Sequence, residues 1–330
     1  MTTDQSRISS SNALSRLASR IPWAYVGRRV LAAIPTMLVI ITVVFFMMRA
    51  APGNPYSAER MLTPAVEANL KASLGLNKPI QEQYFDYLGK VVQGDLGPSM
   101  VFYDKDVSQL LGEGLPVSLT IGLLSITIAM FFGILLGMLA AIRQNSFADY
   151  SVMSIAMVGI SIPTFVTGPL LAMTFGVYLK WFAAGGLDLG RMNFHNLFLP
   201  IVTLSLPQIA IISRLMRASM IEVMRSNFIR TARAKGISER RILLRHAAPA
   251  AILPVISYLG PAIVGVITGS VVIETVFTLP GVGASFIEGA MTRDYTRVMG
   301  AVILYGGLII VMNLIADILY AILDPRVRYQ

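Results

Sequence analysis

The residues best suited to binding chemistry are gathered between Arg214 and Arg245. This window holds nine lysines and arginines against two acidic residues, Glu222 and Glu239. Arginine side chains offer several N–H donors to carboxylates and phosphates. The cluster can therefore dock into a groove on another protein or bind the headgroups of anionic lipids.

The segment from Phe228 to Pro249, which begins within this window, predicts two short helices joined at a glycine. Ser226 or Asn227 can cap the first helix, and Ser238 can cap the second. Gly236 can end the first helix in the left-handed conformation that glycine adopts without strain. We therefore expect the basic residues to lie on two short helices at a membrane surface.

Motifs for catalysis and for metal binding are absent from the sequence. The only Gly-Lys pair, Gly89-Lys90, is followed by Val91, so the chain has no phosphate-binding P-loop. No H-E-x-x-H or G-x-S-x-G motif occurs, and the chain has no cysteine. Its two histidines, His195 and His246, are too far apart in sequence to suggest a metal site. No cofactor is expected in this chain, and if ATP drives the protein, another subunit binds it.

The composition is that of an integral membrane protein. Hydrophobic residues make up 55% of the 330 residues and charged residues only 14%, whereas soluble domains carry about 25% charged residues. Uncharged runs longer than 18 residues recur, and each is a candidate membrane span. The net charge of +9 follows from the excess of lysine and arginine on the cytoplasmic side of membrane proteins. It does not require a nucleic-acid partner.

The uncharged runs predict an all-α protein with six transmembrane helices. We expect a cytoplasmic leader at 1–29, an extracytoplasmic insert at 49–114, a cytoplasmic basic loop at 214–246 and a cytoplasmic tail at 324–330. The spans would cover residues 30–48, 115–142, 150–179, 197–213, 247–273 and 298–316. The expected inner segments then carry 17 lysines and arginines and the outer segments 10, which places both termini in the cytoplasm.

Two features within these segments predict local structure. In the insert, the helical spacing of Tyr84, Tyr87, Leu88 and Val91 predicts one amphipathic helix. In the third span, we expect two prolines to bend the helix, Pro163 and Pro169.

Acidic residues near the span ends are candidates for the transport pathway. Glu274 ends the fifth span and Asp317 lies near the end of the sixth, and either could meet a substrate's amino group. Both residues lie near a membrane boundary, so the alternative is that water solvates them. For Asp317, a further alternative is pairing with the basic inner tail. Between these spans, a loop from Leu279 to Tyr295 is a candidate outer gate. Its candidate residues are Pro280, Gly281, Gly283, Arg293 and Asp294.

Four stretches of the sequence resemble one family. The first runs from Thr231 to Gly236 (Thr-Ala-Arg-Ala-Lys-Gly) and is followed by Pro249 thirteen residues after the glycine. The others are 74–84 in the insert, 274–295, and the C-terminal 313–326. Together they resemble the B-type permeases of the dipeptide/oligopeptide ABC importers. Two positions depart from the general importer motif: Arg230 stands in place of glutamate, and Ala248-Pro249 in place of Leu-Pro.

The resemblance implies a type I ABC importer permease fold, with its transmembrane domain at 115–323, in the bacterial inner membrane. It implies a second homologous permease subunit, two cytoplasmic ABC ATPases that bind ATP and magnesium, an extracytoplasmic solute-binding protein and surrounding lipid. The residues implied to contact the ATPase are Arg230, Thr231, Ala232, Ala234, Lys235, Gly236, Glu239, Arg240, Arg241, Arg245 and Pro249. Hydrophobic contacts with the ATPase are expected from Ile237, Ile242, Leu243 and Leu244.

Other functions remain open at the level of sequence. Members of the resembled family also carry nickel, glutathione or oligosaccharides instead of peptides. A secondary transporter or channel would also have six spans, but it usually places ionisable residues at mid-span. An intramembrane enzyme would need a nucleophile and base within the bilayer, and no histidine lies within a predicted span.

Overall fold

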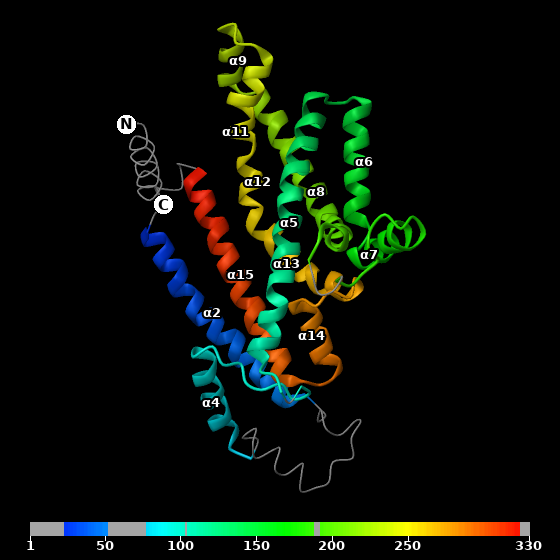
Figure 1. Ribbon diagram of the computed structural model, residues 1–330. Coiled ribbons are helices and arrows are strands. Elements are labelled where there is room, and N and C mark those ends of the chain that lie inside the picture. The colour runs from blue at the N-terminus through cyan, green and yellow to red at the C-terminus, as the bar shows by residue number, and fades with distance from the viewer. Residues whose placement is uncertain (1–22, 52–76, 103, 188–191, 324–330) are drawn as a thin grey trace, which may run out of the picture.

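The computed structural model describes residues 23–51, 77–102, 104–187 and 192–323 (Figure 1). Most of the predicted leader, the tail at 324–330 and residues 52–76 of the insert lie outside the described residues. Within the described ranges every element is helical, and the one β-bridge joins Pro98 to Asp106. The fold-class prediction of an all-α protein is confirmed.

The first and last long helices pack against the insert. These are α2 (Trp23–Ala50) and α15 (Tyr295–Leu323), and the insert contributes the amphipathic helix α4 (Ile80–Val92). The predicted apolar face of α4 meets a cluster that includes the fully buried Phe45. Its Tyr84 hydroxyl also hydrogen-bonds Thr42 Oγ1 at 2.8 Å. The helical period read from the sequence is confirmed here.

The centre of the bundle is the contact between α5 (Val107–Ile142) and α8 (Phe194–Met224). A row of small residues at four-residue spacing faces α8: Ser125, Ala129, Gly133 and Gly137 are all buried. A Cβ on Gly133 would lie only 2.7 Å from Ile212 Cβ. Small residues at this spacing let helix backbones approach closely in membranes. The sequence carried this signal, but our sequence analysis did not single it out.

Two predicted boundaries differ because helices continue beyond the apolar runs. At 1.5 Å per residue, the 36 residues of α5 extend about 54 Å, well beyond the ~30 Å hydrocarbon core. It starts at Val107, so the last part of the predicted insert is helical. Likewise α8 continues to Met224 and includes the first part of the predicted basic loop.

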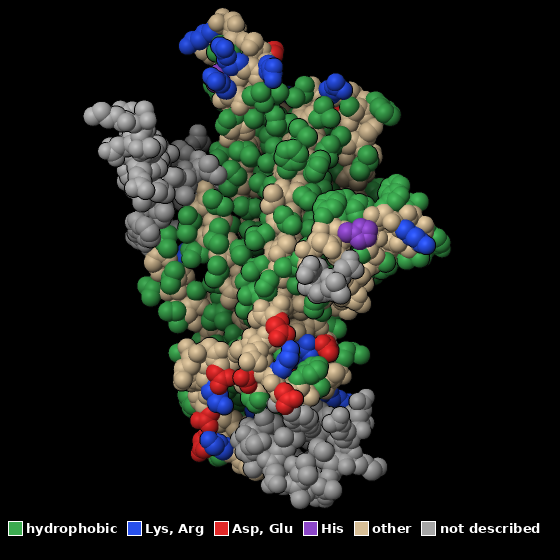
Figure 2. Space-filling view, in the orientation of Figure 1, with side chains coloured by type: hydrophobic (Ala, Val, Ile, Leu, Met, Phe, Trp, Pro, Cys, Tyr) green, Lys and Arg blue, Asp and Glu red, His purple; other side chains and the backbone are tan. Residues whose placement is uncertain are grey.

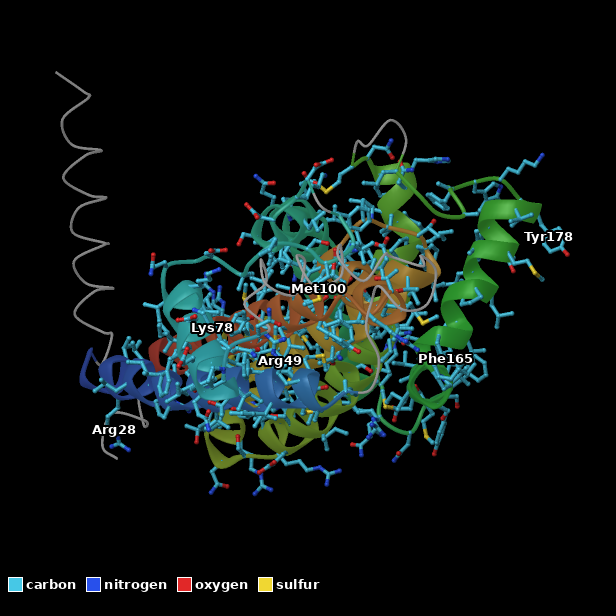
Figure 3. The ribbon with its side chains drawn as sticks, turned by 90° about the horizontal axis from the view of Figure 1, so that it is seen from below. Arg28, Arg49, Lys78, Met100, Phe165 and Tyr178 are labelled. Atoms are coloured by element: carbon cyan, nitrogen blue, oxygen red, sulfur yellow. The ribbon has the colours of Figure 1, made fainter. Side chains whose placement is uncertain are left out.

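The third predicted span, 150–179, is not one gently bent helix. It consists of α6 (Phe147–Ser161), α7 (Thr164–Leu171) and the π-helix η1 (Ala172–Tyr178), with an angle of 103° between the two halves. The break falls at Pro163, whose ring disfavours helical geometry at the preceding residue. Seen from below, Phe165 and Tyr178 lie along an arm that leaves the bundle (Figure 3).

The fifth predicted span, 247–273, is also divided. It contains α11 (Ala248–Ala251), α12 (Leu253–Ser257) and α13 (Leu259–Val276). Pro249 and Pro254 each stand in the first turn of a segment, the position where a proline's missing N–H is tolerated. Only the last segment is long enough to cross a membrane by itself.

Five described helices are long and apolar enough to span a membrane, and six if α6 and α7–η1 count as one span. On the face shown in Figure 2, green apolar side chains cover the middle of the molecule between two ends that carry the charged side chains. One end carries α9 (Asn227–Ala234) and the opposite end carries α4 and α14 (Val282–Met291). We call these the α9 end and the α14 end.

Candidate functional site

The basic segment, which lies between α8 and α11 in the chain, forms a helical projection at the α9 end (Figure 1). It comprises α9, α10 (Glu239–Arg241) and the π-helix η2 (Ile242–Ala247). Ile229 of α9 is fully buried and packs with Ile242, Met216 and Met220. This buried cluster joins the projection to α8.

The turn after α9 depends on Gly236. Its φ is +72°, and its N–H donates to Arg233 O at 2.9 Å. The predicted left-handed helix end is therefore confirmed. A Cβ at this position would meet no atom within 4 Å, so the backbone conformation alone selects glycine here.

The predicted serine caps are wrong in detail. Ser226 and Ser238 precede α9 and α10, but neither side chain makes a capping hydrogen bond. The Ser226 hydroxyl donates instead to Val223 O in the last turn of α8, at 2.6 Å. At Ser238 the backbone carbonyl accepts from the N–H of Arg241 at 2.9 Å.

The outer face of the projection is charged, with an apolar patch. The implied contact residues are exposed except for the buried Ala232: Arg230, Thr231, Ala234, Lys235, Gly236, Glu239, Arg240, Arg241, Arg245 and Pro249. Among the residues expected to make hydrophobic contacts with the ATPase, Ile242 is buried in the cluster below and Leu244 is 52% exposed. Phe228, which sequence reasoning missed, is 51% exposed. Lysine and arginine dominate this end of the molecule (Figure 2).

One carboxylate on the projection is already paired. Arg233 donates from Nε to Glu239 Oε1 at 2.7 Å and from Nη2 to Oε2 at 3.3 Å. These hydrogen bonds lower the pKa of Glu239, so the pair weakens only when the pH falls through that lowered pKa and is intact at neutral pH. Arg240, Arg241 and Arg245 are exposed to solvent.

A second ionic contact joins the neighbouring helices at the same end. Arg217 of α8 donates from Nε and Nη2 to the two carboxylate oxygens of Asp149 at 2.6 and 2.7 Å. The Asn145 N–H also donates to Asp149, and the Asp149 side chain is only 2% exposed. Sequence reasoning missed this pair because its members are 68 residues apart. It braces α6 against the helix that carries the projection.

The candidate gate residues gather at the α14 end. Glu274, expected near a solvated boundary, is fully buried. Its Oε2 accepts from the N–H groups of Gly283 at 2.7 Å and Ala284 at 3.2 Å. Pro280 and Gly281 form the turn that leads into α14. The first turn of α14 is therefore folded back onto α13.

The other end of α14 is fixed to the insert. Asp294 is fully buried and accepts from Ser99 Oγ, from Met100 N at 3.1 Å and from Arg297 N at 3.1 Å. Arg297 also donates to Ser285 Oγ on α14 at 2.8 Å. Arg293 itself is exposed, with φ +57°. Met100 lies over the centre of the bundle when it is viewed from below (Figure 3).

We predict that Asp294→Ala detaches the insert from this corner. The three lost hydrogen bonds are worth about 3 kcal/mol at about 1 kcal/mol each. Met100 is 6% exposed, so a cysteine there, in a chain without other cysteines, should react with maleimide faster in the Asp294→Ala background. Asp104→Ala, an exposed neighbour in the same loop, is the matched control and should leave the rate unchanged. Equal rates in both backgrounds would contradict this prediction.

Asp317 lies apart from both groups. Its carboxylate is 3.1 Å from Arg29 Nη2, which ties α15 to α2. The basic inner tail, expected from sequence as an alternative partner of Asp317, lies outside the described residues. His195 is exposed and His246 is half-buried. In the described part of the chain, no group of three or more His, Cys, Asp or Glu residues could hold a metal ion.

The arrangement of helices is the type I ABC importer permease fold that the sequence predicts. A solved chain of the MetNI methionine ABC transporter, in an inward-facing conformation, superposes with a TM-score of 0.54 at 17% identity. The match covers 66% of this chain and 97% of that one. A second crystal form of the same transporter gives a TM-score of 0.52. At this identity, the likeness concerns the fold alone.

The chain belongs to the family of binding-protein-dependent transport system inner membrane components. The family model matches residues 133–329, and the model of the family's N-terminal region matches residues 23–101. The resemblance to peptide permeases, with the multi-pass inner-membrane character it implied, is confirmed. Membership in this family favours a transport-system membrane component over the secondary transporter and the intramembrane enzyme considered from sequence.

Curated relatives extend over nearly the full chain. The oligopeptide transport system permease protein OppB of Escherichia coli is 51% identical over 305 residues, covering 92% of this chain and 99% of the relative. OppB of Haemophilus influenzae is 48% identical over the same shares of the two chains. The dipeptide transport system permease protein DppB of Bacillus subtilis is 41% identical and covers 92% and 97% of the two chains.

Proposed function

We propose that this chain is one of two permease subunits of an ATP-driven importer that carries di- and oligopeptides across the bacterial inner membrane. The high identity to OppB and DppB over almost the whole length supports the peptide cargo. The family supports the need for a solute-binding protein. In this proposal a second, homologous permease completes the pore, and two cytoplasmic ATPases bind ATP and magnesium and carry out hydrolysis.

The observation that carries the coupling role is the projection at the α9 end. Its exposed arginines, Arg240, Arg241 and Arg245, lie on the same projection as the exposed apolar side chains of Phe228 and Leu244. Charged groups orient a docking partner, and apolar groups held in a groove supply affinity. Through the buried cluster at Ile229, movement of the docked ATPase would reach α8 and the segmented fifth span.

The proposed orientation places the α9 end, with both chain termini, in the cytoplasm. The basic surface at that end supports it. In this orientation the insert and α14 face the solute-binding protein. Closure of the ATPases on ATP would shift the projection and open the pathway toward the α14 end, and hydrolysis would reset it.

We predict that reversing Arg240, Arg241 and Arg245 to glutamate releases the ATPase. The tagged chain, expressed with its partner genes, should co-purify with an ATPase and a second permease when it is wild type. The triple reversal should lower the recovered ATPase at least about tenfold, because three unfavourable charge contacts easily exceed the 1.4 kcal/mol that corresponds to tenfold.

Arg143→Glu is the control for this experiment, since Arg143 is exposed and directly follows α5, outside the projection. A role of the arginines in binding lipid headgroups alone would leave ATPase recovery unchanged in the triple reversal. That outcome would contradict the docking role of the projection.

A further inference from the structure

The first turn of α14 is held by groups from two membrane helices. Glu274 of α13 accepts from the N–H groups of Gly283 and Ala284, and Ser118 of α5 accepts from the N–H of Val282 at 2.9 Å. These are N–H groups that a helix N-terminus leaves without intrahelical partners. The two side chains therefore act as an external cap that joins α14 to α5 and α13.

The contact between α14 and the helices α5 and α13 is so close that only glycine fits at three positions. A Cβ on Gly283 would lie 2.8 Å from Tyr305 Oη, and one on Gly281 would lie 2.8 Å from Ser118 Oγ and collide with the Glu274 carboxylate. On the facing helix, a Cβ on Gly114 would lie 2.8 Å from the Gly281 carbonyl carbon. The glycines let α14 close fully over these helices.

The backbone of α14 stabilises the negative charge of the Glu274 carboxylate. It is fully buried, and its Oε1 makes no hydrogen bond within the described residues. The hydrogen bonds to its Oε2 come from the α14 backbone, whose N-terminal dipole also favours a negative charge. No lysine or arginine is among its hydrogen-bond partners in the described ranges. Withdrawal of α14 would remove these two hydrogen bonds from a buried carboxylate, which opposes the withdrawal.

α14 has further contacts along its length. Beyond its C-terminal end, Asp294 is hydrogen-bonded to Ser99 and Met100 of the insert, and Arg297 of α15 donates to Ser285 and Glu288 on α14 itself. Positive φ angles flank the helix, +49° at Thr278 and +57° at Arg293. Left-handed geometry is strained for both side chains, above all for the β-branched threonine, and such strain is typical of switch regions.

We propose that Glu274 is a positioning residue that latches α14 closed across the α14 end of the transport pathway, and that the latch opens once in each transport cycle. The inference rests on the proposed function for the existence of a cycle. Beyond that function, it identifies α14 as the segment that moves and the Glu274 carboxylate as the group that holds it. A purely structural cap would instead remain closed in every state of the importer.

Val282 offers a direct reporter of the latch. Its side chain is fully buried, only its backbone contacts Ser118, and the chain has no native cysteine. We would place a single cysteine by Val282→Cys and reconstitute the complete complex with its binding protein. The rate of reaction with a membrane-impermeant maleimide would then be measured without nucleotide and with ATP plus vanadate. Met291→Cys, at a position 81% exposed, defines the rate for full access.

The expected result is slow labelling of the Val282 cysteine without nucleotide and at least tenfold faster labelling in the trapped state. Glu274→Gln, which keeps the shape but loses the charge, should label fast in both states. Glu113→Gln removes an exposed carboxylate on α5 and should behave as wild type. Protection in both nucleotide states, in a complex that hydrolyses ATP, would overturn the latch while leaving the proposed function intact. A wild-type rate in Glu274→Gln would also overturn it.

Discussion

Gly236→Val is expected to lower peptide uptake by about tenfold or more while the chain still inserts and assembles. The residue has φ +72° with open space around the missing Cβ, so the effect comes from the backbone and not from a clash. A β-branched residue in this conformation costs about 1–3 kcal/mol. The turn should relax to another geometry and change the angle of the projection on the ATPase.

The measurement is uptake and ATP hydrolysis in proteoliposomes that contain the complete complex. The uncoupled variant should keep substantial hydrolysis while uptake falls. Gly236→Asn is the matched control, because asparagine tolerates the left-handed conformation better than other residues with a side chain, and it should retain most uptake. Normal uptake by the valine variant would show that the geometry of this turn does not matter for coupling.

Asp149→Asn is expected to have the second-largest effect. It removes the charge that faces the bidentate guanidinium of Arg217, whose side chain is only 26% exposed. Breaking a buried ion pair costs about 3–5 kcal/mol, because the remaining charge is left uncompensated. We expect about 3 kcal/mol here, since Arg217 keeps some contact with solvent. The purified complex should unfold at a lower temperature, and uptake should fall as α6 loses its brace on α8.

The exposed ion pair between Lys105 and Glu113 supplies the comparison for this second variant. Their side chains are 45% and 65% exposed, and exposed pairs contribute about 0–1 kcal/mol. Glu113→Gln should therefore leave both the unfolding temperature and uptake near wild type. If Asp149→Asn is equally silent, the pair does not brace the two helices.

Local sequence patterns were sufficient to predict those features whose structure depends on residues close by in the chain. The spacing of Tyr84, Tyr87, Leu88 and Val91 identified the buried face of α4. The single glycine after a basic helix identified the left-handed turn at Gly236. In each case the determining interactions lie within one helix or one turn.

Features that depend on distant contacts were missed or placed incorrectly. Pro163 indicated a bend, but its 103° size depends on how α7 packs against α8 and α13. Glu274 seemed to be at a solvated boundary because the return of α14 onto α13 is not encoded in the local pattern. The partners of Asp149 and Asp294 likewise come from segments far along the chain.

The most direct test of a permease subunit in a peptide importer is ATP-dependent uptake. Proteoliposomes would contain this chain, its second permease and the ATPases, with the binding protein and a labelled tetrapeptide on the side of the α14 end. Our account predicts accumulation that requires both ATP on the opposite side and the binding protein. Equal uptake without ATP, or by this chain alone, would contradict it.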